Sequence, residues 1–137
     1  MQEFKDSEGR RWQIRLTLGG VKRILDELGV DLLNLSQYAD SSENSITMRL
    51  VNDDLFVGRV VAVLLAEQAK NYAVENTLDI FDGATTNAAQ EAFFSEFAFF
   101  FKDRKNKAAE KFANEIRQAR ATIAAGEKSS ESQDAAV

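Results

Sequence analysis

The side chains that could perform chemistry in this sequence are carboxylates, hydroxyls and lysines, because the chain contains no His and no Cys. The absence of both types removes the usual proton-transfer group near neutral pH, thiolate nucleophiles, disulfides and the common zinc ligands. The neighbours Asp53 and Asp54 could bind a metal ion, but acidic pairs at a helix start are far more often capping residues. Asp26 and Glu27 lie on the polar face of an expected helix, not in a cleft that would raise a carboxyl pKa. We therefore expect no enzymatic activity, no metal site and no cofactor.

Two further patterns could bind phosphate or nucleic acid. Gly19-Gly20 follows an expected strand but lacks the Gly-Lys-Ser/Thr ending of a phosphate loop, so we expect it to allow close packing of the hairpin on the first helix. Basic residues between 102 and 111 are interrupted by Asp103 and Glu110, and no exposed aromatic residues accompany them to stack on bases. The whole chain carries a formal charge of −5. We expect a solvated helix face there, with an acidic protein as the remaining partner, and no nucleic-acid binding.

Phenylalanine is concentrated in one segment: six of the ten Phe residues fall within residues 93–101. Five of them fit one broad helical face, whereas Phe99 falls outside it. A large aromatic core explains three or four of these residues. Because each aromatic side chain buries about 150–250 Å², placing all six in one small core is difficult. An exposed Phe near the end of this helix would mark a protein contact.

The last expected helix has a narrow apolar seam, with Phe112, Ile116, Ala119 and Ile123 spaced four, three and four residues apart. Such a seam suits docking into a groove or pairing with another helix. Together with the Phe-rich segment it gives our candidate partner-binding residues: Phe94, Phe97, Phe99, Phe101, Phe112 and Ile116.

The elements that must position these residues begin with a β-hairpin over residues 3–17, whose second strand alternates apolar and polar residues. Thr17 and Gly29 are suited to begin and end the first helix. An exposed loop is expected over residues 36–45. The later helices are expected over residues 46–51, 52–72, 87–101 with Thr85 or Thr86 as its cap, and 103–125.

The chain of 137 residues is the size of a single domain. We expect one domain over residues 1–125 and a disordered polar tail over 126–137. The fold class is mainly α (α+β), with the N-terminal hairpin packed on a bundle of about five helices. No apolar run reaches the roughly 18 residues that would span a bilayer, and the start of the chain lacks a signal-peptide core. We expect a cytosolic protein that does not bind membranes.

The opening of the chain resembles the tail assembly chaperones of tailed bacteriophages and prophages. The resemblance starts with Phe-x-Asp-x-x-Gly-Arg-x-Trp-x-Ile-x-Leu-Thr over residues 4–17 and continues through Val21-Lys22-Arg23 and residues 27–33. Later pieces agree in order, at residues 64–69 and 89–97, and the likeness covers about residues 4–104. The opening is moderately specific, whereas the later helices are generic amphipathic patterns. Residues 105–137 carry no match.

The resemblance implies a helper of tail morphogenesis in the host cytoplasm that is missing from the mature virion. Such chaperones coat and solubilise the tape measure protein, a long helix with an apolar stripe, and leave as the tail tube forms. A frameshifted longer form would recruit tail tube protein, and self-association is also compatible with this role. The family has no catalytic motif to carry over. The alternatives are a structural tail-completion or connector component of the virion, a small enzyme that uses carboxylates alone, and a host-directed regulator.

Overall fold

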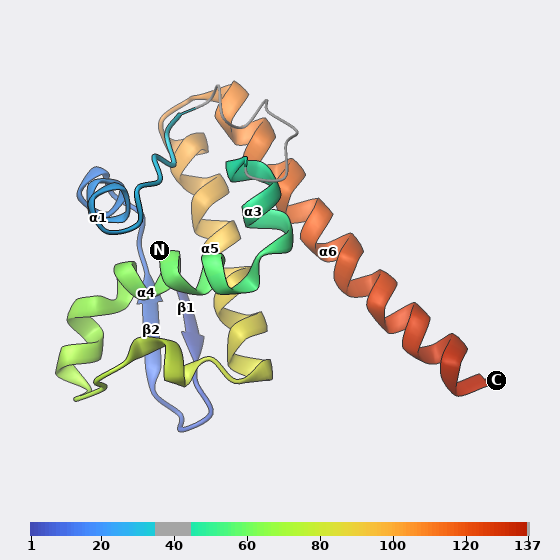
Figure 1. Cartoon of the computed structure of the whole chain (residues 1–137). Helices are drawn as coiled ribbons and strands as arrows, with labels where there is room; N and C mark the ends of the chain where they lie inside the picture. The colour runs from blue at the N-terminus through green and yellow to red at the C-terminus, as the bar shows by residue number, and fades with distance from the viewer. Residues whose placement is uncertain (35–44, 137) are drawn as a thin grey trace.

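The computed structural model describes residues 1–34 and 45–136, with side chains described as far as residue 122. The protein is mainly helical and begins with a two-stranded hairpin, which confirms the expected fold class (Figure 1). The expected loop over residues 36–45 falls almost entirely outside the described residues. The elements in chain order are β1 (Gln2–Lys5), β2 (Arg11–Ile14), α1 (Leu18–Leu28), α3 (Ile46–Asn52), α4 (Asp54–Asn71), the 3-10 helix η1 (Thr77–Ile80), α5 (Gly83–Asp103) and α6 (Lys107–Ala136).

The hairpin pairs β1 and β2 antiparallel, with Phe4 opposite Trp12. The alternation along β2 buries Trp12 and Ile14 and leaves Arg11 and Gln13 exposed, as a half-buried strand requires. Gly9 has a φ of 82° in the turn between the strands, a conformation that favours glycine. The outer edge of β2 is covered by α4, where the Gln68 amide donates to the Gln13 carbonyl and accepts from its N–H at 2.8 and 2.7 Å.

Helix α1 has the expected ends. The Thr17 hydroxyl accepts a hydrogen bond from the Gly20 N–H, and Gly29 ends the helix in the left-handed conformation at φ 70°. The Gly19-Gly20 pair has a different packing role from the one expected. A Cβ on Gly20 would lie 2.8 Å from Leu64 Cδ2, so this glycine allows close approach of α1 to α4 and not to the hairpin. Gly19 is exposed.

Helices α3 and α4 meet at Asp53, which ends the first and caps the second. Its side chain accepts from the Phe56 N–H at 3.0 Å, so the capping role expected for this acidic residue is confirmed. Helix α4 is buried on several sides and contributes Val57, Val60 and Leu65 to the core. The short and long helices predicted around residues 46–51 and 52–72 therefore form within two residues of the expected bounds.

The two C-terminal helices differ from the predictions at their ends. Helix α5 starts four residues earlier than expected, because Asp82, not Thr85 or Thr86, caps it and accepts from the Thr85 N–H at 2.9 Å. Helix α6 starts at Lys107, where Asn106 accepts from the Ala109 N–H. It continues to Ala136, through a segment expected to be disordered. The residues there include Ala, Glu, Lys and Gln, and one glycine costs a helix only about 1 kcal/mol.

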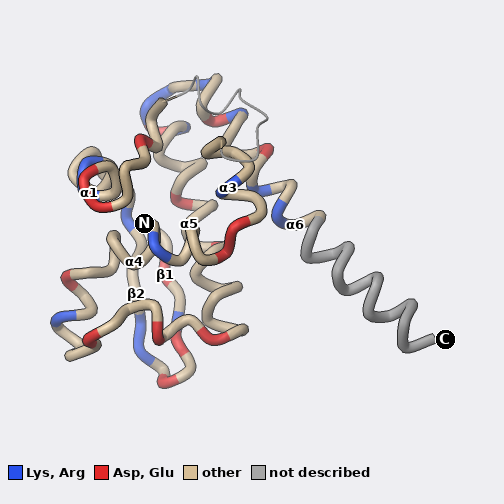
Figure 2. The backbone as a smooth tube through the Cα atoms, viewed as in Figure 1, with Lys and Arg blue, Asp and Glu red and all other residues tan. Residues whose placement is uncertain are grey.

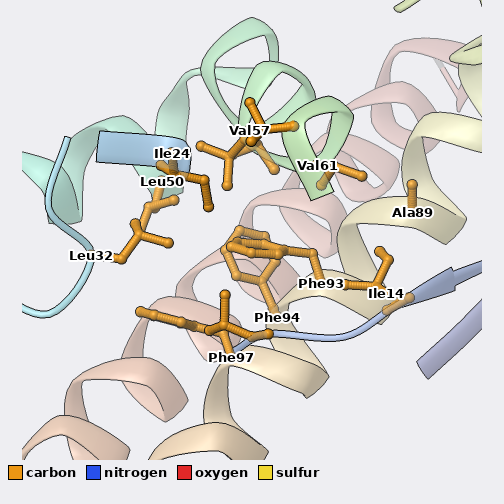
Figure 3. Close-up of a cluster of buried hydrophobic side chains, with 14 of the residues drawn as sticks. Ile14, Ile24, Leu32, Leu50, Val57, Val61, Ala89, Phe93, Phe94 and Phe97 are labelled. Atoms are coloured by element: carbon orange, nitrogen blue, oxygen red, sulfur yellow. The ribbon is translucent and has the colours of Figure 1, made fainter. Parts of the chain in front are cut away.

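The core lies where α4, α5 and the hairpin meet, with α1 and α3 at its edge (Figure 3). Phe93 and Phe97 of α5 lie beneath Val57 and Val61 of α4, and Ile14 of β2 reaches the same cluster (Figure 3). Helix α6 packs along α5 and buries Ala109, Ala113 and Ile116. Small residues on α6 thus face the large aromatic residues of α5.

Candidate partner-binding surface

The Phe-rich segment of α5 is chiefly core. Phe93, Phe94, Phe97 and Phe101 are buried, and Phe100 is partly buried. Their rings contact one another directly: Phe97 stacks on Phe93 with centroids 5.8 Å apart and meets Phe101 edge to face at 5.0 Å. Such pairs stabilise the folded state beyond the area they bury.

Several of the candidate partner-binding residues are therefore placed inside the domain. Phe94, Phe97 and Phe101 face the core because α6 and the hairpin cover that side of α5. Ile116 is buried for the same reason, on the α6 side of the contact. The burial of these four residues corrects their assignment to an open contact surface.

Phe99 and Phe112 remain accessible. The Phe99 side chain is 51% exposed, in keeping with its position outside the broad aromatic face. Phe112 is half-buried and packs against the edge of the core. A large exposed aromatic residue on a helix is a candidate protein contact, because its apolar surface is removed from water only when a partner covers it.

Most of the charged residues that follow Phe99 are basic, although Asp103, one helical turn after it, is acidic and also exposed. Lys102, Arg104, Lys105 and Lys107 follow Phe99 through the end of α5 and the connection to α6, and all four are exposed. Figure 2 shows Lys and Arg colouring along the connection between α5 and α6. The Arg104 guanidinium lies 5.6 Å from the centre of the Phe100 ring, which holds part of this charge against the helix. The surface pairs an aromatic side chain with positive charge.

The second acidic residue of the Asp53-Asp54 pair belongs to an ion pair. Arg120 of α6 binds the Asp54 carboxylate and the Gln90 side-chain oxygen, and Gln90 donates to the same carboxylate oxygen at 2.9 Å. Hydrogen bonding from Arg120 is the main cause that lowers the pKa of Asp54, with burial opposing it and Gln90 adding to it. Asp54 therefore helps to fix α6 to α4 and α5. No group of three or more metal-ligating side chains occurs among the described residues.

Asp6 is the most elaborately bonded carboxylate, and its role is structural. One of its oxygens accepts from the Glu8 and Arg10 backbone N–H groups, and the other from Arg10 Nε at 2.6 Å and Trp12 Nε1 at 2.9 Å. Burial opposes its ionisation, but the hydrogen bonds from Trp12, Arg10 and Glu8 outweigh it and hold the pKa of Asp6 below its usual value. This cluster was not expected from the sequence, although the Asp-x-x-x-Arg-x-Trp spacing of residues 6–12 was an available signal for it.

An open pocket of about 210 Å³ lies between α4, η1 and the start of α5. Val57 and Gly58 of α4, Leu78 of η1 and Phe81 line it, and Asp54 and Gln90 are among its polar lining residues. Leu55 also lines it and is 56% exposed. The sequence did not predict this pocket, because no local pattern indicates that Leu55, Leu78 and Phe81 lie together.

Comparisons with known proteins give no relative: no family model matches the sequence, and neither a curated protein nor a solved structure matches the chain. Among the helices formed by described residues, none combines the length and apolar character needed to cross a bilayer.

Proposed function

We propose that this protein is a tail assembly chaperone of a tailed bacteriophage or prophage, which binds the tape measure protein and keeps it soluble until the tail tube forms. The proposal is supported by the resemblance over about residues 4–104. The observation that carries it is the exposed Phe99, which is followed in the chain by the exposed basic residues Lys102, Arg104, Lys105 and Lys107. Phe99 would cover part of the apolar stripe of a long helical client, and the basic residues would contact acidic positions next to that stripe.

Such a contact is small, which suits a chaperone that must leave. One aromatic side chain with a charged rim gives an interface of modest area and affinity, so each copy dissociates fast while many copies together shield a long client. The chain would then act without turnover. The longer form that recruits tail tube protein belongs to the same proposal.

The test is co-expression with the long, helix-rich tape measure protein that the proposal expects to be encoded directly downstream. Phe99→Asp is expected to leave the tape measure protein insoluble, because a carboxylate cannot cover an apolar stripe, while the variant itself stays folded. Leu25→Asp is the matched control, since Leu25 of α1 is also an exposed apolar residue, at 42%. It is expected to preserve solubilisation. Equal solubilisation by wild type and Phe99→Asp contradicts the contact.

Mass spectrometry of purified particles separates the chaperone from the alternative, a structural tail-completion component. A chaperone is expected to be missing from finished virions. Recovery of the chain in stoichiometric amounts from mature particles contradicts the proposal and favours the structural role.

A further inference from the structure

The pocket between α4, η1 and α5 has the size of a single side chain. Its volume of about 210 Å³ lies below the range of about 300–1,000 Å³ found for small-molecule sites. The residues that form its walls are mostly apolar, so a bulky apolar group entering it would lose contact with water on most sides.

A glycine keeps the pocket open. Gly58 lies inside α4, where glycine costs about 1 kcal/mol relative to alanine. A Cβ at this position would meet Leu78 Cδ2 at 3.5 Å and Phe81 at 3.9 Å, which are ordinary contact distances. Packing therefore does not require a glycine here, and a larger side chain would occupy the pocket from its α4 wall.

The chain around the pocket is acidic. From residue 71 to residue 95 there is no Lys or Arg, and the acidic residues are Glu75, Asp79, Asp82 and Glu91. Asp79 and Asp82 are exposed on either side of Phe81, and Asp53 is exposed at the start of α4. Figure 2 shows acidic residues both at the α3–α4 junction and between α4 and α5. Arg120 neutralises Asp54. Arg59 on α4, one turn after Leu55, adds one positive charge, but Asp53, Asp79 and Asp82 outnumber it, so the remaining charge around the pocket is negative.

We propose that this pocket binds one bulky apolar side chain of a partner helix that carries Lys or Arg one turn before and after it. The pocket would bury the apolar side chain, Leu55 would pack beside it, and Asp53, Asp79 and Asp82 would attract the flanking cations. The surface differs from the one around Phe99 in position and in charge. The proposal therefore goes beyond the chaperone function and does not require the tape measure protein.

The probe is an alanine-based helical peptide of about 18 residues, with one central Phe and Lys at four residues on each side. Titration into the isotope-labelled full chain is expected to shift the amide resonances of Gly58, Leu78 and Ala89, and binding should weaken as salt is raised. A second peptide with Glu in place of Lys is expected to bind at least about tenfold more weakly. Equal binding of the two peptides, or shifts centred elsewhere, overturns the proposal.

Gly58→Leu tests the pocket directly. It is expected to weaken binding of the Lys peptide at least about tenfold by filling the pocket, while the better helix former keeps α4 folded. Gly19→Leu on α1 is the matched control, because a Cβ there meets only the Thr17 hydroxyl at 3.7 Å. Unchanged peptide binding by folded Gly58→Leu overturns the proposal.

Sedimentation of the unliganded chain tests a second copy as the occupant. If Gly58→Leu abolishes self-association but not peptide binding, the pocket binds another copy and the proposal is wrong.

Discussion

Two buried regions of this molecule are stabilised by different physics. The interior face of α5 contains an aromatic cluster around Phe97, in which rings pack directly against rings. The turn of the hairpin is organised around the Asp6 carboxylate, which accepts four hydrogen bonds from backbone and side chains. The first depends on shape and apolar area, and the second on a charge whose partners are all in place.

The comparison teaches that residue type alone does not reveal which residues are buried, which are exposed and which fix a turn or join helices. Phe97 and Phe99 are two positions apart on one helix, yet one is core and the other lies in solvent. Asp6 and Asp54 are both carboxylates with lowered pKa values, yet Asp6 fixes a turn whereas Asp54 joins two helices to α6. Each difference predicts the effect of a substitution, which an experiment can test.

The largest expected effect is that of Phe97→Ala. The side chain is fully buried and contacts two other rings, so its truncation leaves a cavity that the surrounding residues fill only in part. We expect the free energy of unfolding to fall by about 3–5 kcal/mol. Urea denaturation followed by circular dichroism measures it. Phe97→Leu, which retains most of the volume, should cost much less, and a loss below about 1 kcal/mol in Phe97→Ala would show that the site relaxes.

Asp6→Asn is expected to have the next largest effect. The amide that replaces one carboxylate oxygen would face donors, either Trp12 Nε1 and Arg10 Nε or the two backbone N–H groups. Leaving such buried donors unpaired costs about 1–3 kcal/mol. The control is Glu8→Gln, because Glu8 is exposed and its ion pair with Arg10 is worth about 1 kcal/mol or less. Equal unfolding midpoints of Asp6→Asn and wild type would contradict the role of the carboxylate.

The two regions should also respond differently to pH. The folded-state pKa of Asp6 lies below its ordinary value of 3.8. At pH values around and between the folded and unfolded pKa values, the folded state therefore binds fewer protons at Asp6 than the unfolded state does. Its contribution to stability is complete above the unfolded pKa and is lost as pH falls through the folded pKa. Asp54 and Asp82 also have lowered pKa values and add to the same trend, Asp82 because Ser7 and Thr85 donate hydrogen bonds to it.

Unfolding midpoints measured between neutral pH and about pH 2 test this difference. Wild type should lose stability mainly below about pH 4. Phe97→Ala should be less stable at every pH but follow the same dependence, whereas Asp6→Asn should show a shallower decline in acid. A decline of the same steepness in Asp6→Asn and wild type would mean that Asp6 does not couple to folding.

Local chemistry explains which parts of this structure the sequence could predict. Thr17, Gly29 and Asp53 cap helices through contacts within a few residues, and their roles were predictable from neighbouring positions. The exposure of Phe99 followed from helical periodicity. The cap at Asp82 was missed because Thr85 and Thr86 have equally good capping side chains. The bond from Ser7 of the hairpin turn to Asp82 joins residues distant in the chain.

The candidate sites depended on such distant contacts even more strongly. Periodicity gives the faces of α5 and α6 but not which of these faces other elements cover, so the sequence could not show that Phe94, Phe101 and Ile116 are buried. The buried Glu96 shows the same limit: its carboxylate accepts from the Leu16 N–H at 2.9 Å, eighty positions earlier in the chain. The pocket lined by Leu55, Leu78 and Phe81 exists only once three elements meet.

The smallest expected effect on stability is that of Phe99→Ser, and it is the sharpest contrast with Phe97. The Phe99 side chain is half exposed, and exposed substitutions away from caps and buried networks usually change the free energy of unfolding by less than about 0.5 kcal/mol. Removing the ring should also raise the protein concentration at which the chain precipitates, because an exposed aromatic surface promotes association. Denaturation and solubility measurements on Phe99→Ser and wild type check both results. A decrease in the free energy of unfolding comparable to that of Phe97→Ala would place Phe99 in the core and would contradict the proposed contact with a client.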